Sequence, residues 1–491
     1  MKNFNLLLVL FCLLSGYPLM GQEQTMVLTL ERAVEIARQQ SPEAWYARHT
    51  FRSQYWNYCY YKANYRPSLT LTSNPNFNHS INPITLPDGT SKYLQQNETR
   101  ADARLSLTQN VPFTGGSISL QSTLNRMDNL ELKTNSYRTS PISIEYQQNL
   151  LGYNAFKWER KIEPIRFEEA KKSYVETLEL VSAWAINRFF NLARAQTNLE
   201  IARFNYVQAD TLFIFAQGRF EIGTITENDI LRLELNRLTE ESNMLNAQIE
   251  VDNCMQELRA YLGISDAVPI IVSIDNEVPQ LEIDADKALQ LAFANHPTIE
   301  AINRRKIESE RVVAQTKAST GLRADLYAQF GLTQTNEDLR EAYNNLLNHQ
   351  FIQVGIRLPI LDWGRGKGQV RVAQSQRDMV FNREEQNESN FEQNVLKAVK
   401  QFNLQAGKVE IAAKTDQIAE RSNEVARRLY LLGRSTILEL NSSIVEKDAA
   451  KRGRINTLFN YWSLYYTLRS LTLYDFEKGI ALTEDYESLI K

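Results

Sequence analysis

Hydrophobic residues follow two different periods along this chain. Between residues 178 and 216 they recur every seven positions in two parallel seams, one mostly of large and one mostly of small side chains. The seams are Leu178, Ala185, Leu192, Leu199, Tyr206 and Phe213, and Val181, Ala195, Ala202, Ala209 and Ala216. A heptad repeat with small residues at one seam predicts a long helix that packs closely against other helices.

Each half of the chain contains such a heptad region, and a glycine divides each region. The period resumes after Gly223 in the first half and continues across Gly433 in the second. The further positions are Leu231, Leu235, Leu238, Leu245 and Ile249, then Leu404, Ile411, Ile418, Val425 and Leu432, and then Leu440 and Ile444. We therefore predict two helical hairpins, over about 155–263 and about 366–475, that turn at these glycines.

Other segments alternate apolar and polar residues with period two, which is typical of strands with one apolar face. The apolar positions are Leu69/Leu71, Leu105/Leu107, Ile118/Leu120, Ile142/Ile144/Tyr146, Ala328/Phe330/Leu332 and Ile352/Val354/Ile356/Leu358. These runs approach the ~10 residues of a membrane strand. The polar segments 74–100 and 335–349 are expected to be loops outside a membrane.

These strands are too few to close a barrel. The second half supplies two strands and the first half two to four, whereas open strand edges are not tolerated in lipid. Several copies of the chain are therefore expected to share one barrel, and the same symmetry would gather the long hairpins into a tube.

The chain also repeats itself. Ala33, Ala37, Pro42, Lys62 and Ala63 recur at one constant offset as Ala288, Ala292, Pro297, Lys317 and Ala318, which indicates a duplication. We predict a first repeat at 22–263 with strands at about 66–150, a linker at 264–284, a second repeat at 285–475 with strands at about 322–360, and a tail at 476–491. The first repeat holds about 45 extra residues, which an additional alternating pair of strands would explain.

The N-terminus indicates export, and the composition and net charge argue against a disordered or nucleic-acid-binding protein. Residues 1–21 contain Lys2, an apolar run and a Gly-Tyr-Pro break, the pattern of a secretory signal peptide. The 491 residues carry a net charge of −3, so nothing indicates disorder or nucleic-acid binding. Cys59 and Cys254 remain after the signal, and the sequence leaves open whether they pair.

The glycine cluster "GRGKG" at 364–368 has two readings. A phosphate-binding loop would need a hydroxyl residue after Lys367, but Gly368 stands there. The alternative is a joint at which proline ends a strand and glycine permits the chain to turn into a helix. We favour such joints at Pro359, Gly364 and Gly366 and, in the first half, at Pro112, Gly115 and Gly116 and again in the segment "NLLGY" at 149–153.

Catalytic and metal-binding patterns are missing from the sequence. The four histidines, His49, His79, His296 and His349, are scattered without metal-ligand spacing, and no nucleophile motif is present. We expect neither an enzyme nor a bound cofactor or metal.

In this order, the motifs resemble the TolC-type outer-membrane efflux family. The resemblance rests on the repeat openings "LTLERAVEIARQQSP" and "ADKALQLAFANHP", the segments "LPILDWGRG" and "VPFTGG", and the hairpin tips "RFEIGTITENDIL" and "RLYLLGRSTILEL". It implies an α+β membrane protein: a homotrimer whose β-barrel in the outer membrane continues as a long periplasmic α-helical barrel. It further implies a passive duct that works with a periplasmic adaptor and an inner-membrane pump.

The resemblance also implies roles for residues at the hairpin tips. By their distance from the tip glycines, Asp229 and Tyr430 match the pair that closes the periplasmic entrance, and Glu439 matches an acidic ring. Three converging Glu439 carboxylates would raise one another's pKa. The plain alternative is that Asp229 and Glu439 are solvated carboxylates on a helix face and that Phe220 and Tyr430 only pack the hairpin tips. The expected adaptor contacts are Arg219, Phe220, Gly223 and Thr224 at one tip and Gly433, Arg434 and Ser435 at the other.

The sequence leaves two rival classes of protein: a periplasmic coiled-coil adaptor or structural envelope protein without a pore, and an enzyme. A periplasmic adaptor also has coiled-coil hairpins, but it carries one hairpin between compact β-domains, whereas this chain has two and membrane-length strands. An enzyme with a coiled-coil insertion would need a set of catalytic residues, and the sequence shows none.

Overall fold

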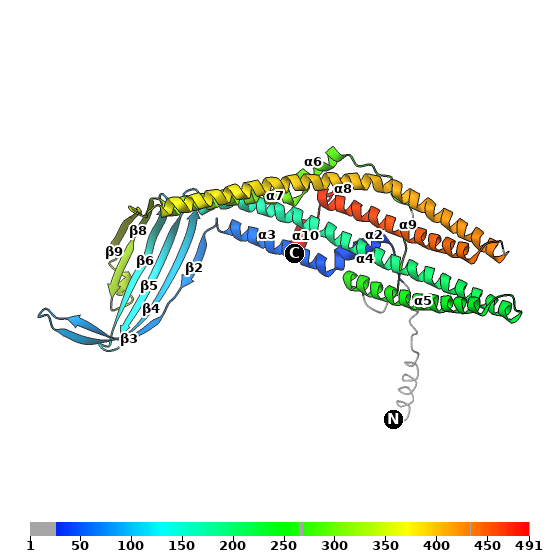
Figure 1. The fold of residues 1–491 in the computed structure, drawn as a ribbon. Helices are drawn as coiled ribbons and strands as arrows, with labels where there is room; N and C mark the ends of the chain where they lie inside the picture. The colour runs from blue at the N-terminus through cyan, green and yellow to red at the C-terminus, as the bar shows by residue number, and fades with distance from the viewer. Residues whose placement is uncertain (1–25, 265–268, 276, 433, 491) are drawn as a thin grey trace, which may run out of the picture. The chain divides into compact units, whose positions relative to one another are not determined.

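A computed structural model describes residues 26–264, 269–275, 277–432 and 434–490 (Figure 1). The signal peptide predicted for residues 1–21 lies outside these ranges. The chain divides into two compact units, one formed by residues 1–50, 173–296 and 392–485 and the other by residues 51–172, 297–391 and 486–491. Each unit contains helices from both halves of the sequence.

The same order of helices occurs twice. The pairs are α2 (Leu30–Gln40) and α6 (Ala285–Asn295), α3 (Pro42–Ala63) and α7 (Pro297–Thr320), α4 (Ala155–Glu221) and α8 (Arg365–Leu431), and α5 (Glu227–Leu262) and α9 (Ile437–Thr472). α4 and α8 each have 67 residues, and α5 and α9 each have 36. The short strands β1 (Met26–Leu28) and β7 (Ile270–Val272) each precede one set of these helices and pair with each other in parallel.

In the first unit, side-chain contacts place the hairpin helices in the order α5-α4-α9-α8. Arg203 of α4 donates to Gln248 of α5 at 2.9 Å. Asn205 of α4 donates to Asp448 of α9 at 2.8 Å, and Arg454 of α9 donates to Asp416 of α8 at 2.9 Å. This order leaves α5 and α8 at the two ends of the layer.

The heptad seams differ in burial because of this order. Leu178 and Leu192 of α4 are buried, because α4 has a helix on each side. Ile411 and Ile418 of α8 are 67% and 62% exposed, and the seam of α5 at Leu231, Leu235, Leu238, Leu245 and Ile249 is exposed as well. Among the described residues, the apolar seam of each end helix is therefore not covered by another helix of the chain.

The second unit contains one antiparallel sheet in the order β2-β4-β5-β6-β8-β9, and β3 pairs with the first part of β4. The strands are β2 (Ser68–Thr72), β3 (Asn76–Thr85), β4 (Ser91–Val111), β5 (Gly116–Asn129), β6 (Thr134–Asn149), β8 (Arg323–Asn336) and β9 (Leu347–Arg357). Residues 74–100, expected to be a loop, mostly form the β3–β4 hairpin. Of the segment 335–349, the two ends belong to β8 and β9, and the residues between these strands form a short 3-10 helix, η1 (Glu341–Tyr343).

Helices and strands of the second unit follow one another in the same order. Tyr58 of α3 stacks on Phe167 of α4, with ring centroids 4.4 Å apart. Arg304 of α7 contacts Glu169 of α4 at 2.6 Å, and the neighbouring Arg305 contacts Glu384 of α8 at 2.7 Å. The helix order α3-α4-α7-α8 thus matches the strands β2, β6, β8 and β9 to which these helices connect.

The remaining elements are short. β10 (Tyr474–Asp475) and β11 (Ile480–Ala481) pair after α9, and α10 (Tyr486–Ile490) follows them. Within the described ranges, no helix is both long and apolar enough to cross a membrane.

Candidate functional site at the hairpin tips

The two hairpin tips are built alike. After α4, Gly223 adopts a left-handed backbone with φ of +73°, and the amide of Thr224 donates to the carbonyl oxygen of Arg219 at 2.9 Å. At the other tip, the amide of Arg434 donates to the carbonyl oxygen of Leu429, also at 2.9 Å. This backward hydrogen bond closes the end of a helix and reverses the chain. The second tip glycine, Gly433, lies outside the described residues.

Both returning helices begin with a capping box. Thr226 precedes α5, its hydroxyl accepts from the amide of Asp229 at 3.3 Å, and its own amide donates to the Asp229 carboxylate at 3.2 Å. Thr436 and Glu439 form the same pair of bonds at the start of α9, at 3.3 and 3.1 Å. Such reciprocal bonds satisfy amides that would otherwise lack partners. The two acidic residues singled out in the sequence therefore have a structural role in each chain.

Hydrogen bonds keep both carboxylates ionised. The Thr226 hydroxyl and amide hold the pKa of Asp229 below its usual value, and the Ser435 hydroxyl and Thr436 amide do the same for the pKa of Glu439. Ser435 donates to Glu439 at 2.6 Å. A rise in pKa through three converging Glu439 side chains, which remains a prediction, would act against these bonds.

Tyr430 lies half-buried in the last turn of α8. Among the hydrogen bonds found for the described residues, none joins Tyr430 to Asp229 within one chain. The pairing of these two residues as a gate stays a prediction, which a neighbouring copy of the chain would have to satisfy.

Apolar side chains surround the polar caps at both tips. Ile222 beside Gly223 and Leu438 in the first turn of α9 are three-quarters exposed. Phe220 and Leu432 are exposed too. Large exposed apolar residues next to charged caps are typical of a surface that binds another protein.

The glycine cluster "GRGKG" forms the joint between β9 and α8. The Asp362 carboxylate accepts from the amides of Gly364 at 2.9 Å and Gly366 at 2.8 Å. Pro359 lies in the segment that leaves the strand. The amides that would hold a phosphate in a nucleotide loop are thus occupied by a carboxylate of the chain itself.

Pro112, Gly115 and Gly116 lie elsewhere than the sequence predicted. They connect β4 to β5 rather than a strand to a helix. A Cβ atom on Gly116 would lie 2.5 Å from the Gln147 carbonyl oxygen, so close strand pairing requires glycine there. Strand and helix of the first half join at residues 150–154, which overlap the second predicted joint at 149–153. There Asn154 caps α4 and donates to the Pro112 carbonyl oxygen at 3.2 Å.

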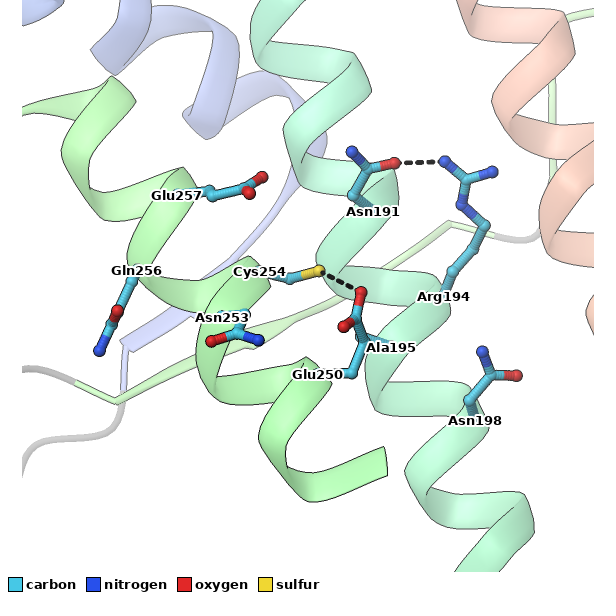
Figure 2. Close-up of a pocket in the computed structure, with 9 residues that line it drawn as sticks. All are labelled: Asn191, Arg194, Ala195, Asn198, Glu250, Asn253, Cys254, Gln256 and Glu257. Atoms are coloured by element: carbon cyan, nitrogen blue, oxygen red, sulfur yellow. Dashed lines mark hydrogen bonds between the residues drawn. The ribbon is translucent and has the colours of Figure 1, made fainter. Parts of the chain in front are cut away.

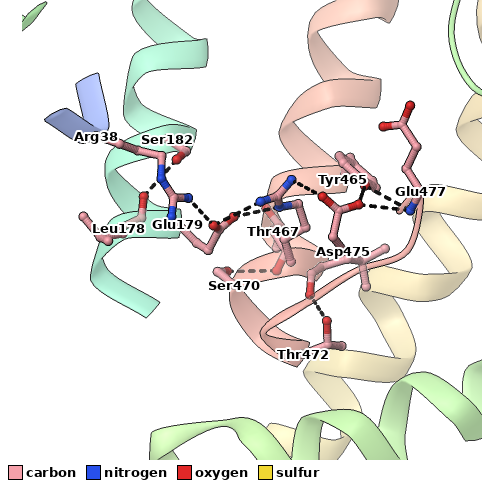
Figure 3. A network of polar contacts seen from close by, with 12 residues as sticks. Arg38, Leu178, Glu179, Ser182, Tyr465, Thr467, Ser470, Thr472, Asp475 and Glu477 are labelled. Atoms are coloured by element: carbon pink, nitrogen blue, oxygen red, sulfur yellow. Dashed lines mark hydrogen bonds and ion pairs between the residues drawn. The ribbon is translucent and has the colours of Figure 1, made fainter. Parts of the chain in front are cut away.

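A buried ionic network that the sequence did not reveal ties four segments of the first unit together (Figure 3). Glu179 of α4 is 0% exposed and accepts from Arg38 of α2 at 2.5 Å and from Arg469 of α9 at 2.8 Å. Arg469 also donates to Asp475 at 2.8 Å, and Tyr465 donates to the same carboxylate at 2.7 Å. The network fixes α2, α4 and α9 against the strand β10.

Asp475 gives this network a predictable pH dependence. Burial alone would raise its pKa, but the Tyr465 hydroxyl, the Lys478 and Glu477 amides and the charge of Arg469 hold the pKa below its usual value. A lowered folded-state pKa stabilises the fold above the unfolded-state pKa of about 4, and this contribution is lost as pH falls through the folded value.

We therefore expect the thermal midpoint of the wild-type protein to exceed that of Asp475→Asn at about pH 7, and the gap to shrink toward about pH 3. Thermal unfolding followed by circular dichroism at several pH values measures both. A gap that stays constant with pH would show that the charge of Asp475 does not stabilise the fold.

Cys254 lines a polar groove of about 700 Å³ between α4 and α5 (Figure 2). Burial and the neighbouring Glu250 raise the pKa of the Cys254 thiol to about 11, so it is protonated at neutral pH and a poor nucleophile. Both Cys254 and Cys59 are free thiols, which answers the question of pairing that the sequence left open.

Comparison with known proteins identifies the family that this fold resembles. Residues 288–450 match the family model of outer membrane efflux proteins. None of the curated proteins in the comparison matches the chain. The resemblance to the TolC-type family that the sequence indicated is confirmed.

Solved structures share the fold over nearly the whole chain. The Campylobacter jejuni CmeC outer membrane channel superimposes with a TM-score of 0.67 and 14% identity over 94% of this chain and 88% of its own. The outer membrane protein VceC from Vibrio cholerae superimposes with a TM-score of 0.62 and 15% identity over 90% of this chain and 95% of its own. The open state of the Neisseria gonorrhoeae MtrE outer membrane channel superimposes with a TM-score of 0.60 and 13% identity over 90% of this chain and 88% of its own.

Proposed function

We propose that this chain is the outer-membrane channel component of a tripartite efflux or type I secretion system. Three copies form a passive duct from the periplasm to the exterior, gated at the hairpin tips. A periplasmic adaptor binds the tips, and an inner-membrane pump supplies the energy. The family match and the shared fold support this assignment, and the chain's own surfaces supply the physical reasons for it.

The observation that carries the proposal is that both layers of the chain end in unpaired edges. The helical layer ends in α5 and α8, whose apolar seams face away from the helices they contact. In the part of the chain that the structure describes, the sheet ends in β2 and β9, each of which pairs on one side only. Edges of this kind are completed when the same interface repeats head to tail around a ring.

The sheet has the two faces that a membrane channel needs. On one face Leu107 lies opposite Leu120, and Leu120 lies opposite Ile144. On the other, Thr108 and Ser119 are hydrogen-bonded at 3.0 Å, and Gln121 donates to Glu145 at 2.6 Å. An apolar face suits lipid, and a face of hydroxyl, amide and carboxylate groups suits a water-filled lumen.

Exposed apolar residues also mark the end of the sheet from which the helices leave. Phe113 in the β4–β5 turn and Trp363 in the β9–α8 joint are each 90% exposed. Aromatic residues concentrate where a membrane meets water. This end of the sheet fits the periplasmic surface of the outer membrane, with the hairpins extending into the periplasm.

Ion conductance in planar bilayers tests the gate. Replacing Asp229 with Ala and Tyr430 with Phe removes the proposed bond, which is worth about 1.5–3 kcal/mol as a charge-assisted hydrogen bond. We expect the open fraction to rise about ten- to hundredfold, up to saturation.

Because Asp229 also caps α5, the matched control is Thr226→Ala, which weakens the cap but keeps the carboxylate. Its conductance should stay near that of the wild type. If the double variant conducts no better than this control, Asp229 and Tyr430 do not form the gate.

A further inference from the structure

Besides β3, two strands of the sheet, β4 and β5, have no helix of their own. β2, β6, β8 and β9 each continue directly from or into one of the four helices of the unit, whereas β4 and β5 are joined to each other and lie between β2 and β6. The extra residues of the first repeat therefore form part of the sheet itself. The β3–β4 hairpin extends beyond it (Figure 1).

The inserted strands carry the same two faces as their neighbours. The register places Leu69 of β2 opposite Leu107, Leu107 opposite Leu120, Leu120 opposite Ile144, and Ile144 opposite Phe330 of β8. Directly opposed residues of antiparallel strands lie on one face of a sheet. One apolar row thus runs from β2 through β4 and β5 to β8, as expected if all of these strands face lipid.

Six strands also fit the width of the four helices in the same unit, α3, α4, α7 and α8. Four helices packed 8–10 Å apart occupy about 32–40 Å of circumference. Six strands about 4.8 Å apart and tilted by about 40° occupy about 38 Å, but four such strands occupy only about 25 Å. The inserted pair removes a mismatch between sheet and helices that a four-stranded chain would have to absorb by a steeper tilt.

The strand directions permit closure. Because neighbouring strands alternate in direction along the sheet, an even number leaves β2 and β9 antiparallel to each other. A head-to-tail contact of β9 with β2 of the next copy then continues the antiparallel order without interruption.

We propose that each copy contributes six strands to an eighteen-stranded barrel, with β4 and β5 as part of its lipid-facing wall. The inference rests on the three-copy duct proposed above. At a tilt of about 40°, eighteen strands give a backbone diameter of about 36 Å, compared with about 24 Å for twelve.

Lipid contact of single side chains tests the strand number. In the full-length protein with Cys59→Ala and Cys254→Ala, single cysteines are introduced by Leu107→Cys, Leu120→Cys, Gln121→Cys or Ile144→Cys. Each is labelled with a fluorophore, and the protein is reconstituted in bilayers of brominated lipid, which quenches on contact. The position Gln121 is the matched control, because it neighbours Leu120 on β5 but lies on the polar face.

We expect labels at Leu107 and Leu120 to lose as much fluorescence as the label at Ile144, and the label at Gln121 to lose little. Quenching at Ile144 without quenching at Leu107 and Leu120 would place β4 and β5 outside the wall and overturn the eighteen-stranded barrel. Absence of quenching at Ile144 as well would contradict the membrane duct itself. The two failures are therefore distinguishable.

Discussion

Replacing Ile411 and Ile418 together with Glu should abolish assembly and leave single chains in detergent. Both side chains lie on the face of α8 that points away from α9, and both are exposed in the single chain. Burial of each against α5 of the next copy is worth about 1.5–3 kcal/mol, and a carboxylate placed there must also be desolvated without a partner. Size-exclusion chromatography with light scattering measures the result.

The matched control for this prediction is Gln417→Glu. Gln417 is exposed on the same helix but lies about 100° around it from Ile418. This variant adds negative charge without entering the seam, so it should assemble like the wild type. If the double variant also assembles, the seam of α8 is not an interface between copies.

Glu179→Gln should cost the fold about 3–5 kcal/mol, the usual effect of breaking a buried ion pair by removing one charge. The substitution keeps the volume of the side chain but leaves the guanidinium groups of Arg38 and Arg469 facing a neutral amide. We expect a clear fall in the thermal midpoint, measured by circular dichroism in detergent, because α2, α4 and α9 lose their common anion.

Glu200→Gln provides the comparison. Glu200 lies on the same helix and pairs with Lys451 at 3.0 Å, but its side chain is 69% exposed. Exposed ion pairs contribute about 0–1 kcal/mol, so this variant should unfold close to the wild type. Equal effects at Glu179 and Glu200 would show that burial does not make the network important.

The local patterns of the sequence were sufficient to predict the repeating elements. Period seven identified the hairpin helices, period two identified most of the strands, and the tip residue Gly223 lies where the chain reverses. These features depend on neighbouring residues, and their physical causes act within one turn of helix or one pair of strands. The prediction of a loop at 74–100 was wrong, because the polar residues there pair as strands beyond the apolar row.

Features that depend on distant residues could not be predicted in the same way. The heptads at Leu192 and Ile411 look alike in the sequence, yet one is buried and the other exposed, since periodicity shows that a face is apolar but not which helix covers it. Likewise, Arg38, Glu179 and Arg469 meet across long sequence separations. The turn at Pro112 was assigned to a strand–helix joint because proline and glycine mark both kinds of chain reversal.

At the tips, Asp229 and Glu439 were selected by their distance from the tip glycines. The structure shows a further role for both residues that this distance does not indicate. Each is the third residue of a helix that a preceding threonine caps, so each closes a capping box. A carboxylate can cap its own helix and still face a partner, because it has two oxygens.

The central claim is that one chain is an incomplete wall and that copies complete it through α5 with α8 and β9 with β2. The most direct measurement is the mass of the protein extracted from membranes in detergent, determined by native mass spectrometry. The account predicts a complex of three chains that requires detergent to remain in solution. A single chain that is monomeric and soluble without detergent would contradict it.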